Sequence, residues 1–329
     1  MSKNSELRVL ALVLGSLLLC ELTLWKLEPS LSGDVRHIQE MAEISARLSA
    51  DTTGLTVLWL GNSITDDGVD LPLADSLIED GLRHHASMYK VHPDGSAIAE
   101  WTQIASNQFF ERGSRPDILV IPFAWNLLSD QSKVEAERIG RWYLRTPADW
   151  LEFLRFDAGG FEEGSRAIFA NFSAAFGNRE RVRTRVLAML PGYEEMALGL
   201  SRGGGTDEQP AADANRLDSY DRLSRLALQA AADGTRLILV AMPVREPYEL
   251  EAGLLETAAD LGVGIIDARH VDGIDADQFR DQMHLLPAGA RIVTRSVAGQ
   301  LVSSGHLTRR PVPAGPTAYS AAHHPTRSN

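Results

Sequence analysis

A serine in the amino-terminal third of the chain is the residue with the clearest capacity for chemistry. Ser63 follows the apolar residues 57–60 through Gly61 and Asn62, so its hydroxyl is predicted to lie where a buried strand ends. Ligands of open α/β sheets bind at the carboxyl ends of the strands. A Gly-x-Ser segment alone is also typical of an ordinary turn. A nucleophilic serine needs, in addition, a base, a group that orients the base, and oxyanion donors.

Asp281 and His284 provide a candidate base and its orienting group. They stand three residues apart, after the last predicted strand. An aspartate at this spacing can accept the Nδ1 proton of the histidine, which leaves Nε2 free to face Ser63. Each residue alone is typical of a surface loop. Together, and in this order, they predict a catalytic triad of Ser63, His284 and Asp281.

Gly95 and Asn126 are the candidate oxyanion donors. About thirty residues separate Ser63 from Gly95, and about thirty more separate Gly95 from Asn126, which is one strand–helix unit each time. All three are therefore predicted just after consecutive strands. The backbone N–H groups of Ser63 and Gly95 and the side-chain amide of Asn126 can converge there as an oxyanion hole. Taken singly, Gly95 is typical of a turn and Asn126 of a helix cap or loop.

The elements that must position these residues alternate between strands and helices. Strands are predicted at 55–61, 87–92, 117–123, 236–242 and 263–267. Helices are predicted near 71–83, 97–111, 217–232, 247–260 and 287–302. This alternation predicts an α/β fold with a parallel five-stranded sheet covered by helices on both faces.

The amino terminus predicts a membrane anchor. Residues 9–27 are almost entirely apolar, which is near the length that a membrane-spanning helix needs. Lys3 and Arg8 precede them, which favours a cytoplasmic segment 1–8 and a domain outside the cytoplasmic membrane. A cleaved signal peptide is the alternative, but no Ala-x-Ala-like cleavage site follows. Glu21 is costly inside lipid, so it either lies near the outer headgroups or contacts a multi-span partner.

Three further regions complete the predicted organisation. Residues 28–54 are predicted to form a helical stalk with an apolar stripe of Val35, Ile38, Met41, Ile44 and Leu48. Residues 55–304 form the catalytic domain, with a helical insert at 127–215, and 305–329 are predicted to be a disordered tail. The insert is interpreted either as a helical subdomain packed on the core or as a cap over Ser63 that shapes acceptor binding or leans on the membrane. The insert contains possible residues for binding an acceptor, meaning a molecule that would receive an acyl group: Trp142, Tyr143, Arg145 and Trp150.

Composition limits the classes of function. The 329 residues are 44% hydrophobic and 23% charged, which is ordinary for a globular protein. The net charge of −12, with no basic stripe, argues against nucleic acid as a partner. Cys20 is the single cysteine, so no intramolecular disulfide can form.

These segments together resemble the SGNH (GDSL-like) hydrolase superfamily over roughly residues 55–303. The resemblance lies in Gly61-Asn62-Ser63, in Gly95, in the stretch from Phe123 to Asn126, and in Asp281-x-x-His284 before a terminal helix. The chain departs from the usual pattern at Asn62, where Asp is commonest, and at Leu127, which follows Asn126 where the family commonly has Asp. The resemblance implies a flavodoxin-like three-layer α/β/α sandwich, a Ser-His-Asp triad, and no need for a metal or nucleotide cofactor.

The functional hypothesis follows from the anchor and this resemblance. Anchored members of the superfamily resemble envelope-polysaccharide O-acyltransferases and esterases. We therefore expect an acyl-enzyme at Ser63, with O-acyl transfer to, or ester hydrolysis on, a cell-envelope glycan, and with a multi-span membrane acyltransferase as a possible partner. The alternatives are a lipid esterase or lysophospholipase, and a catalytically silent scaffold of a membrane complex. The sequence leaves open the acyl group, the acceptor and the oligomeric state.

Overall fold

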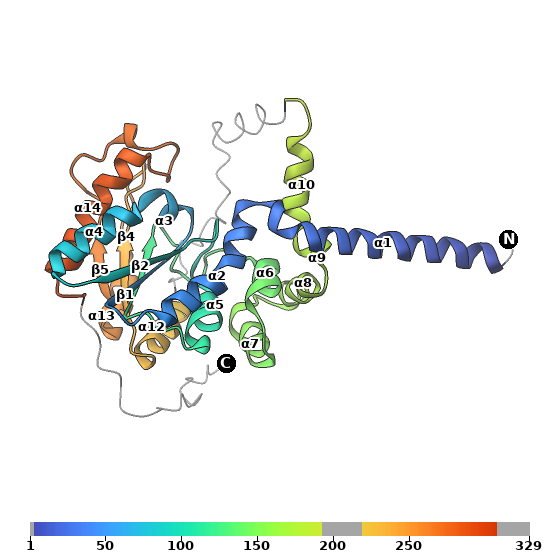
Figure 1. The fold of residues 1–329 in the computed structure, drawn as a ribbon, viewed down its shortest axis with the longest axis horizontal. Coiled ribbons are helices and arrows are strands. Elements are labelled where there is room, and N and C mark those ends of the chain that lie inside the picture. The colour runs from blue at the N-terminus through green and yellow to red at the C-terminus, as the bar shows by residue number, and fades with distance from the viewer. Residues whose placement is uncertain (1–2, 193–218, 308–329) are drawn as a thin grey trace.

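A parallel five-stranded sheet forms the centre of the protein in the computed structural model, which describes residues 3–192 and 219–307 (Figure 1). The strand order is β2-β1-β3-β4-β5. The strands are β1 (Leu55–Leu60), β2 (Ala86–Val91), β3 (Ile118–Phe123), β4 (Arg236–Ala241) and β5 (Gly264–Asp267). This confirms the predicted α/β fold. The order reverses between β1 and β3, and the crevice at such a switch point is where doubly wound sheets bind ligands.

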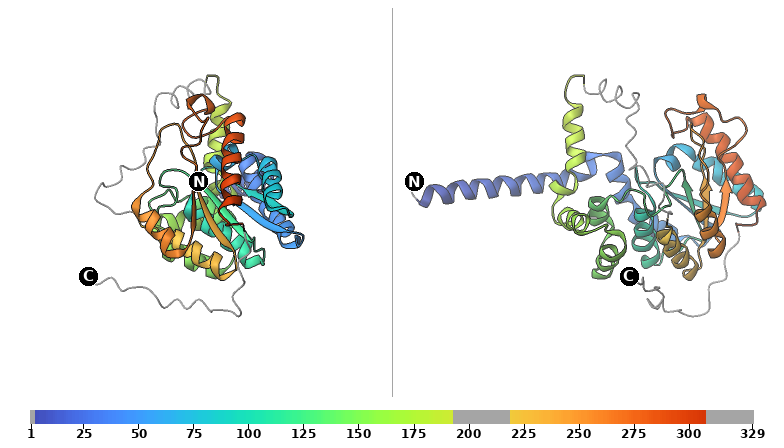
Figure 2. Two further views of the ribbon diagram at one scale, coloured as in Figure 1. Left: turned by 90° about the vertical axis from the view of Figure 1, so that its left-hand side faces the viewer. Right: turned by 180° about the vertical axis from the view of Figure 1, so that it is seen from behind.

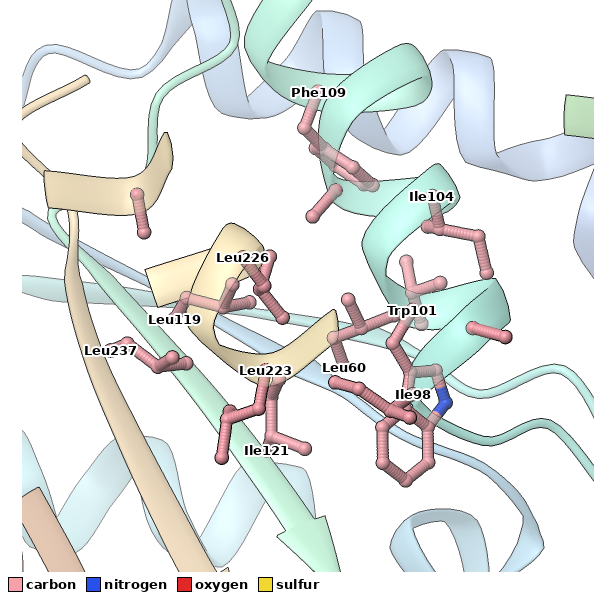
Figure 3. Close-up of a cluster of buried hydrophobic side chains, with 14 of the residues drawn as sticks. Leu60, Ile98, Trp101, Ile104, Phe109, Leu119, Ile121, Leu223, Leu226 and Leu237 are labelled. Carbon is pink, nitrogen blue, oxygen red and sulfur yellow. The ribbon is translucent and has the colours of Figure 1, made fainter. Parts of the chain in front are cut away.

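Helices cover both faces of the sheet and enclose two apolar cores. One face is covered by α4 (Leu71–Leu82) and α14 (Pro287–Ser303), which pack against each other. The other is covered by α5 (Ile98–Ile104), which continues as a π-helical turn, and by α12 (Asp221–Ala232) and α13 (Ala252–Leu261). We call the apolar core on this face, between the sheet and α5, α12 and α13, the second core. Figure 3 shows some of its side chains, in which Leu60 and Leu119 from the sheet meet Trp101 and Leu223 from the helices. Because strand side chains alternate between faces, β1 contributes to both cores.

The segment predicted as a stalk is the helix α2 (Gly33–Ala50), and it is not a free-standing stalk. Ile38, Met41, Ile44 and Leu48 of its predicted stripe are buried in the second core, and Val35 is also fully buried. Ser32 caps its first turn by accepting a hydrogen bond from the Val35 N–H. The period of the stripe identified a helix correctly, but its partner is the α/β domain, so α2 is part of that domain.

The amino-terminal helix α1 (Lys3–Leu31) projects away from the domain, as Figures 1 and 2 show. Its segment Ser5–Leu31 has 27 residues and a mean hydropathy of 2.1 in its most apolar window, and that window is not buried in the protein. Length and composition of this kind occur in membrane anchors and in signal sequences alike.

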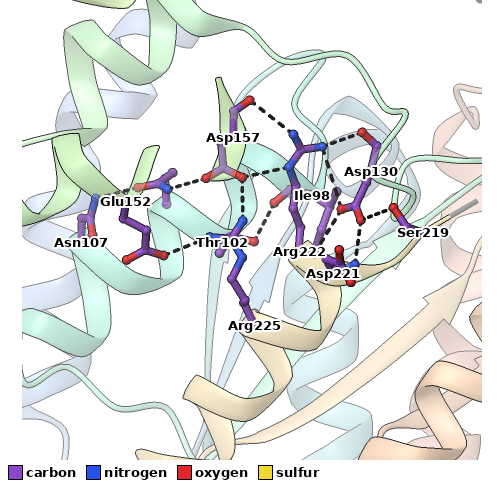
Figure 4. Close-up of polar contacts among 11 residues, drawn as sticks. Ile98, Thr102, Asn107, Asp130, Glu152, Asp157, Ser219, Asp221, Arg222 and Arg225 are labelled. Atoms are coloured by element: carbon purple, nitrogen blue, oxygen red, sulfur yellow. Dashed lines mark hydrogen bonds and ion pairs between the residues drawn. The ribbon is translucent and has the colours of Figure 1, made fainter. Parts of the chain in front are cut away.

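The described part of the insert is a set of short helices between β3 and α12. They are α6 (Ala136–Arg138), α7 (Pro147–Glu152), α8 (Phe161–Phe172), α9 (Ala174–Gly177) and α10 (Arg179–Ala188), with π-helical turns at Ile139–Tyr143 and Phe153–Asp157. Figure 4 shows how the insert is attached: the buried Asp157 carboxylate accepts hydrogen bonds from Arg222 at 2.9 Å and from Arg225 at 2.6 Å. Gln103 of α5 donates a further hydrogen bond of 2.9 Å to the same carboxylate. A buried carboxylate needs such compensation. The insert is therefore packed on the core beside α5 and α12.

Two helices differ from the predicted elements. A short helix, α3 (Ser63–Gly68), begins directly at Ser63 and was not predicted. The helix predicted at 247–260 begins later, at Ala252. The end of the insert, the beginning of the helix predicted at 217–232, and the predicted tail from residue 308 onward lie outside the described residues.

Candidate active site

Ser63 is the first residue of α3, immediately after the carboxyl end of β1. Asn62 caps this helix, because its Oδ1 accepts a hydrogen bond of 2.9 Å from the Ile64 N–H. The Asn62 Nδ2 donates a second hydrogen bond of 2.9 Å to the Ser96 carbonyl oxygen. An ionised Asp could accept but could not donate. Asn62 therefore ties the serine turn to the loop that follows β2.

Position 61 needs a glycine because the backbone there passes very near the Thr65 side chain. A Cβ at position 61 would lie 1.9 Å from the Thr65 Oγ1, which no side chain allows. The Gly61 carbonyl oxygen accepts hydrogen bonds from the Trp101 Nε1 at 3.1 Å and the Ser96 Oγ at 3.0 Å. These buried donors fix the backbone that precedes Ser63.

The loop before α14 brings the predicted base to the serine. Phe279 and Leu285 form an antiparallel bridge, so residues 279–285 make a narrow turn with Asp281 and His284 in it. The His284 Nε2 lies 2.8 Å from the Ser63 Oγ. The His284 Nδ1 lies 2.7 Å from the Asp281 Oδ2 and 2.9 Å from its Oδ1. The three predicted triad residues are thus joined in one hydrogen-bonded relay.

Asp281 is held in its ionised form. Burial alone would raise the pKa of its carboxyl group, but hydrogen bonds from the Met283 and His284 backbone N–H groups and from the His284 ring outweigh that effect and lower the pKa. An ionised Asp281 accepts the Nδ1 proton. His284 then presents an unprotonated Nε2 to the serine hydroxyl.

The candidate oxyanion donors lie after three adjacent strands, as the spacing predicted. Ser63 follows β1, Gly95 follows β2 and Asn126 follows β3. Gly95 is exposed and has a φ of +63°, a conformation that favours glycine. Within the described part of the chain, the Ser63 N–H, the Gly95 N–H and the Asn126 amide have no hydrogen-bond partner. Three uncommitted donors at one edge of the sheet suit a developing oxyanion.

Trp125, the residue before Asn126, has an unusual backbone conformation. Its φ is +49°, one of two positive values among the described non-glycine residues. The Leu127 carbonyl oxygen accepts a hydrogen bond of 3.0 Å from the Ile98 N–H, which joins this turn to the start of α5. Non-glycine residues in this conformation are concentrated at functional sites.

Residues of α2 and the insert hold the Gly95 loop and were not predicted as part of the site. The Asp34 Oδ1 accepts a hydrogen bond of 2.9 Å from the Asp94 N–H. Arg138 donates to the Asp94 carbonyl oxygen and forms two hydrogen bonds, of 2.6 and 2.7 Å, with the buried Glu100. The Gly95 loop therefore contacts both α2 and the insert. Asp34 could be recognised in the sequence only as a helix cap, because nothing local indicates its long-range contact.

The site is open and its surroundings are polar. The Asp281 side chain is 46% exposed and that of His284 is 18% exposed. We call the charged side chains beside the triad the polar rim, which consists of the ion pairs Asp67–Arg280 at 2.8 Å and Asp66–Lys90 at 2.7 Å together with the exposed Asp94. In the described ranges, including this site, no group of three or more His, Cys, Asp or Glu residues could hold a metal ion.

The possible acceptor-binding residues of the insert differ in how far they are buried. Tyr143 is fully buried in the second core. Trp142 and Trp150 are partly buried and pack against the same core, where Trp150 makes an edge-on contact with Phe153. Arg145 is exposed, but its backbone N–H is bonded to Asp149, as part of the turn that caps α7. Tyr143 is therefore a core residue, whereas a role of Trp142, Arg145 and Trp150 in binding an acceptor stays a prediction.

Comparisons with known proteins show resemblance only to solved structures. No family model matches the chain, and no curated protein matches it. A lipase/acylhydrolase from Enterococcus faecalis is similar with a TM-score of 0.38 and 12% identity, over 76% of this chain and 96% of that one. TesA is similar with a TM-score of 0.35 and 14% identity, over 77% and 99%. The lipase Lip_vut3 from a goat rumen metagenome is similar with a TM-score of 0.33 and 12% identity, over 77% and 100%.

Proposed function

We propose that this chain is a membrane-anchored, extracytoplasmic serine acyl-ester enzyme of the SGNH type. The observation that supports it most directly is the relay from Asp281 through His284 to Ser63, built from segments 221 residues apart in the sequence. A chance approach of these three groups in the correct hydrogen-bonding order would be unusual. The relay also argues against a catalytically silent scaffold.

The geometry supports a two-step mechanism. As the Ser63 Oγ attacks an acyl carbonyl carbon, the His284 Nε2 accepts its proton and Asp281 stabilises the imidazolium. The oxyanion accepts hydrogen bonds from the free donors at Ser63, Gly95 and Asn126. His284 then protonates the leaving alcohol, and an acyl-enzyme ester remains on Ser63. A second hydroxyl group, from water or from a sugar, loses its proton to His284 and attacks the ester, which releases the acyl product and restores Ser63.

Two carboxylates of α1 support an uncleaved anchor over a removed signal peptide. Glu28 is only 3% exposed and pairs with Arg141 through two contacts of 2.8 and 2.9 Å. Glu21 accepts a hydrogen bond of 2.8 Å from the Ser173 hydroxyl. Cleavage after Glu28 would leave the largely buried guanidinium of Arg141 without its carboxylate partner. The basic residues at the start of the chain favour an extracytoplasmic domain.

The polar rim supports a hydrophilic substrate. Ion pairs and an exposed carboxylate beside Ser63 suit the hydroxyl groups of a glycan better than an acyl chain, which needs an apolar channel. We therefore propose O-acyl groups on a cell-envelope glycan as the substrate or product. If the reaction is transfer, a multi-span membrane acyltransferase is the partner that would deliver the acyl donor across the membrane. A lipid esterase or lysophospholipase is the second candidate, favoured by the apolar surface of α8 described below.

Product analysis of the full-length protein in lipid nanodiscs tests this proposal. We expect release of acetate from O-acetylated oligosaccharides, or transfer of acetyl from an activated ester to an unacylated oligosaccharide, detected by mass spectrometry. Ser63→Ala should abolish either product, while Ser165→Ala, a serine of the insert, should leave it unchanged. Rapid turnover of lysophospholipid with no change in any glycan would instead establish the lipid esterase.

A further inference from the structure

Helix α8 has an apolar stripe that faces away from the protein. Phe161, Ile168 and Phe172 recur at helical spacing and are 93%, 40% and 80% exposed, and Phe169 beside them is 60% exposed. The opposite face of α8, with Gly164, Ala167 and Ala170, is buried against the rest of the insert. Exposed aromatic residues gathered on one helix face mark an interaction surface.

The residues that follow this stripe form hydrogen bonds with α1. Phe172 is followed by Ser173, whose hydroxyl donates to Glu21, and the Ala174 and Ala175 N–H groups donate to the same carboxylate. Glu21 thus caps α9, which packs against α1. Figures 1 and 2 both show α9 beside α1 where α1 leaves the domain. The ring of Phe169 lies 5.8 Å from that of Phe176, so α8 and α9 share an apolar contact at this level.

The length of α1 places the contact between Glu21 and Ser173 within a bilayer. Glu6 and Arg8 mark the inner end of the apolar run. From Leu7 to Glu21, about fifteen residues rise only about 22 Å, at about 1.5 Å per residue. The hydrocarbon core of a bilayer is about 30 Å thick. If α1 spans the membrane, the hydrocarbon region therefore extends several ångströms beyond Glu21 and includes the level at which Ser173 and the end of α8 contact it.

We infer that the α8 stripe of Phe161, Ile168, Phe169 and Phe172 is inserted in the outer leaflet of the membrane that α1 spans. This rests on the proposed anchor. The occupant is lipid because the stripe ends next to α9, which packs against the proposed membrane-spanning helix, and because phenylalanine is typical of helices that lie in the interface. Glu21 becomes tolerable at this depth because the insert itself supplies three donors. The insert is thus a second membrane attachment that fixes the tilt of the domain.

Spin labelling of the full-length protein in pure phosphatidylcholine vesicles tests this inference. Replacing the single cysteine by Cys20→Ser permits one nitroxide label at each of Phe161→Cys, Phe172→Cys, Leu14→Cys and Leu255→Cys. Leu14 reports the anchor, and Leu255, an exposed leucine of α13, is the matched control. Oxygen concentrates in the bilayer, while a nickel chelate stays in water, so the ratio of the two relaxation effects reports depth.

The inference predicts that labels at 161 and 172 have a ratio of oxygen to nickel accessibility well above that at 255 and closer to that at 14. A lipid pattern at 14 with an aqueous pattern at 161 and 172 would overturn the inference and leave the anchor intact. An aqueous pattern at 14 would overturn both. Labels at 161 and 172 shielded from both reagents would show that a second copy of the chain covers the stripe, which also contradicts insertion in lipid.

Discussion

Single residues determine the chemistry at the sheet edge. Asn62 caps α3 through its Oδ1 and donates through its Nδ2 to the Ser96 carbonyl oxygen, so one amide joins the serine turn to the Gly95 loop. Asp281 receives three hydrogen bonds from residues 283 and 284, which makes the turn self-orienting. The base is therefore positioned by local contacts within one short loop.

Removing the base and removing its orienting group should have unequal effects. We expect His284→Ala to lower kcat/KM for an activated acetate ester by about 10³-fold or more, as for other members of a triad. Asp281→Asn should cost less, because the imidazole stays but loses its fixed tautomer and its stabilising charge. Asp277→Asn, an exposed acid of the same loop, is the control and should leave the rate unchanged. Wild-type rates in both triad variants would reject the relay as the catalytic machinery.

The triad could be predicted because its signals are local. Ser63 follows a buried apolar run, and Asp281 and His284 are three residues apart. The role of Tyr143 and Trp150 could not be predicted in the same way, because an aromatic residue in an insert serves equally well as a binding face or as core. Only the tertiary structure shows that Tyr143 is fully buried.

Helix α2 connects α1 to the loop that follows β2. Its His37 ring stacks on His92 with centroids 4.0 Å apart, and its Nε2 accepts a hydrogen bond of 2.9 Å from the His92 N–H. His37 must therefore be neutral at Nε2. Burial and the neighbouring His37 lower the pKa of His92 to about 4, although Asp66 at 3.4 Å opposes this. Burial also lowers the pKa of His37, against the effect of Glu40 and Asp34.

This histidine pair should make stability depend on pH. With both pKa values depressed, the unfolded chain binds protons more readily than the folded one as pH falls. The stabilisation is fully present above the ordinary histidine pKa of about 6.5 and is lost as pH falls toward about 4. The Tm of the protein in detergent should therefore fall between pH 7 and pH 5.

Matched histidine variants locate the effect. His37→Asn removes one of the two rings and should flatten this pH dependence, whereas His84→Asn, at an exposed histidine, should preserve it. A full wild-type slope in His37→Asn would show that the contact between α2 and the loop does not titrate.

The sequence predicted that α2 is a helix, but it did not predict that α2 packs on the α/β domain. A stripe every three or four residues indicates which face is apolar, and it says nothing about which surface covers that face. A soluble fragment beginning at Asp51 would consequently expose the core that Ile38, Met41 and Ile44 cover. Experiments on this protein therefore need α2, and the full chain supplies it.

At the scale of the whole molecule, the alternation of strands and helices was sufficient to predict the sheet, because parallel strands need crossover connections. The position of the insert was not predictable. It depends on buried long-range ion pairs such as Glu28–Arg141, between residues more than a hundred positions apart. Glu28–Arg141 joins α1 to the insert, and Arg222–Asp157 joins the insert to the α/β domain.

The most direct test of the central claim is covalent labelling of the full-length protein with a fluorophosphonate, followed by peptide mass spectrometry. An activated serine displaces fluoride and keeps the phosphonyl group. We predict one adduct on the peptide that contains Ser63, no adduct there in Ser63→Ala, strongly slowed labelling in His284→Ala, and unchanged labelling in Ser165→Ala. A folded wild-type protein that leaves Ser63 unmodified, or that is labelled as fast after Ser63→Ala, would contradict a nucleophilic Ser63.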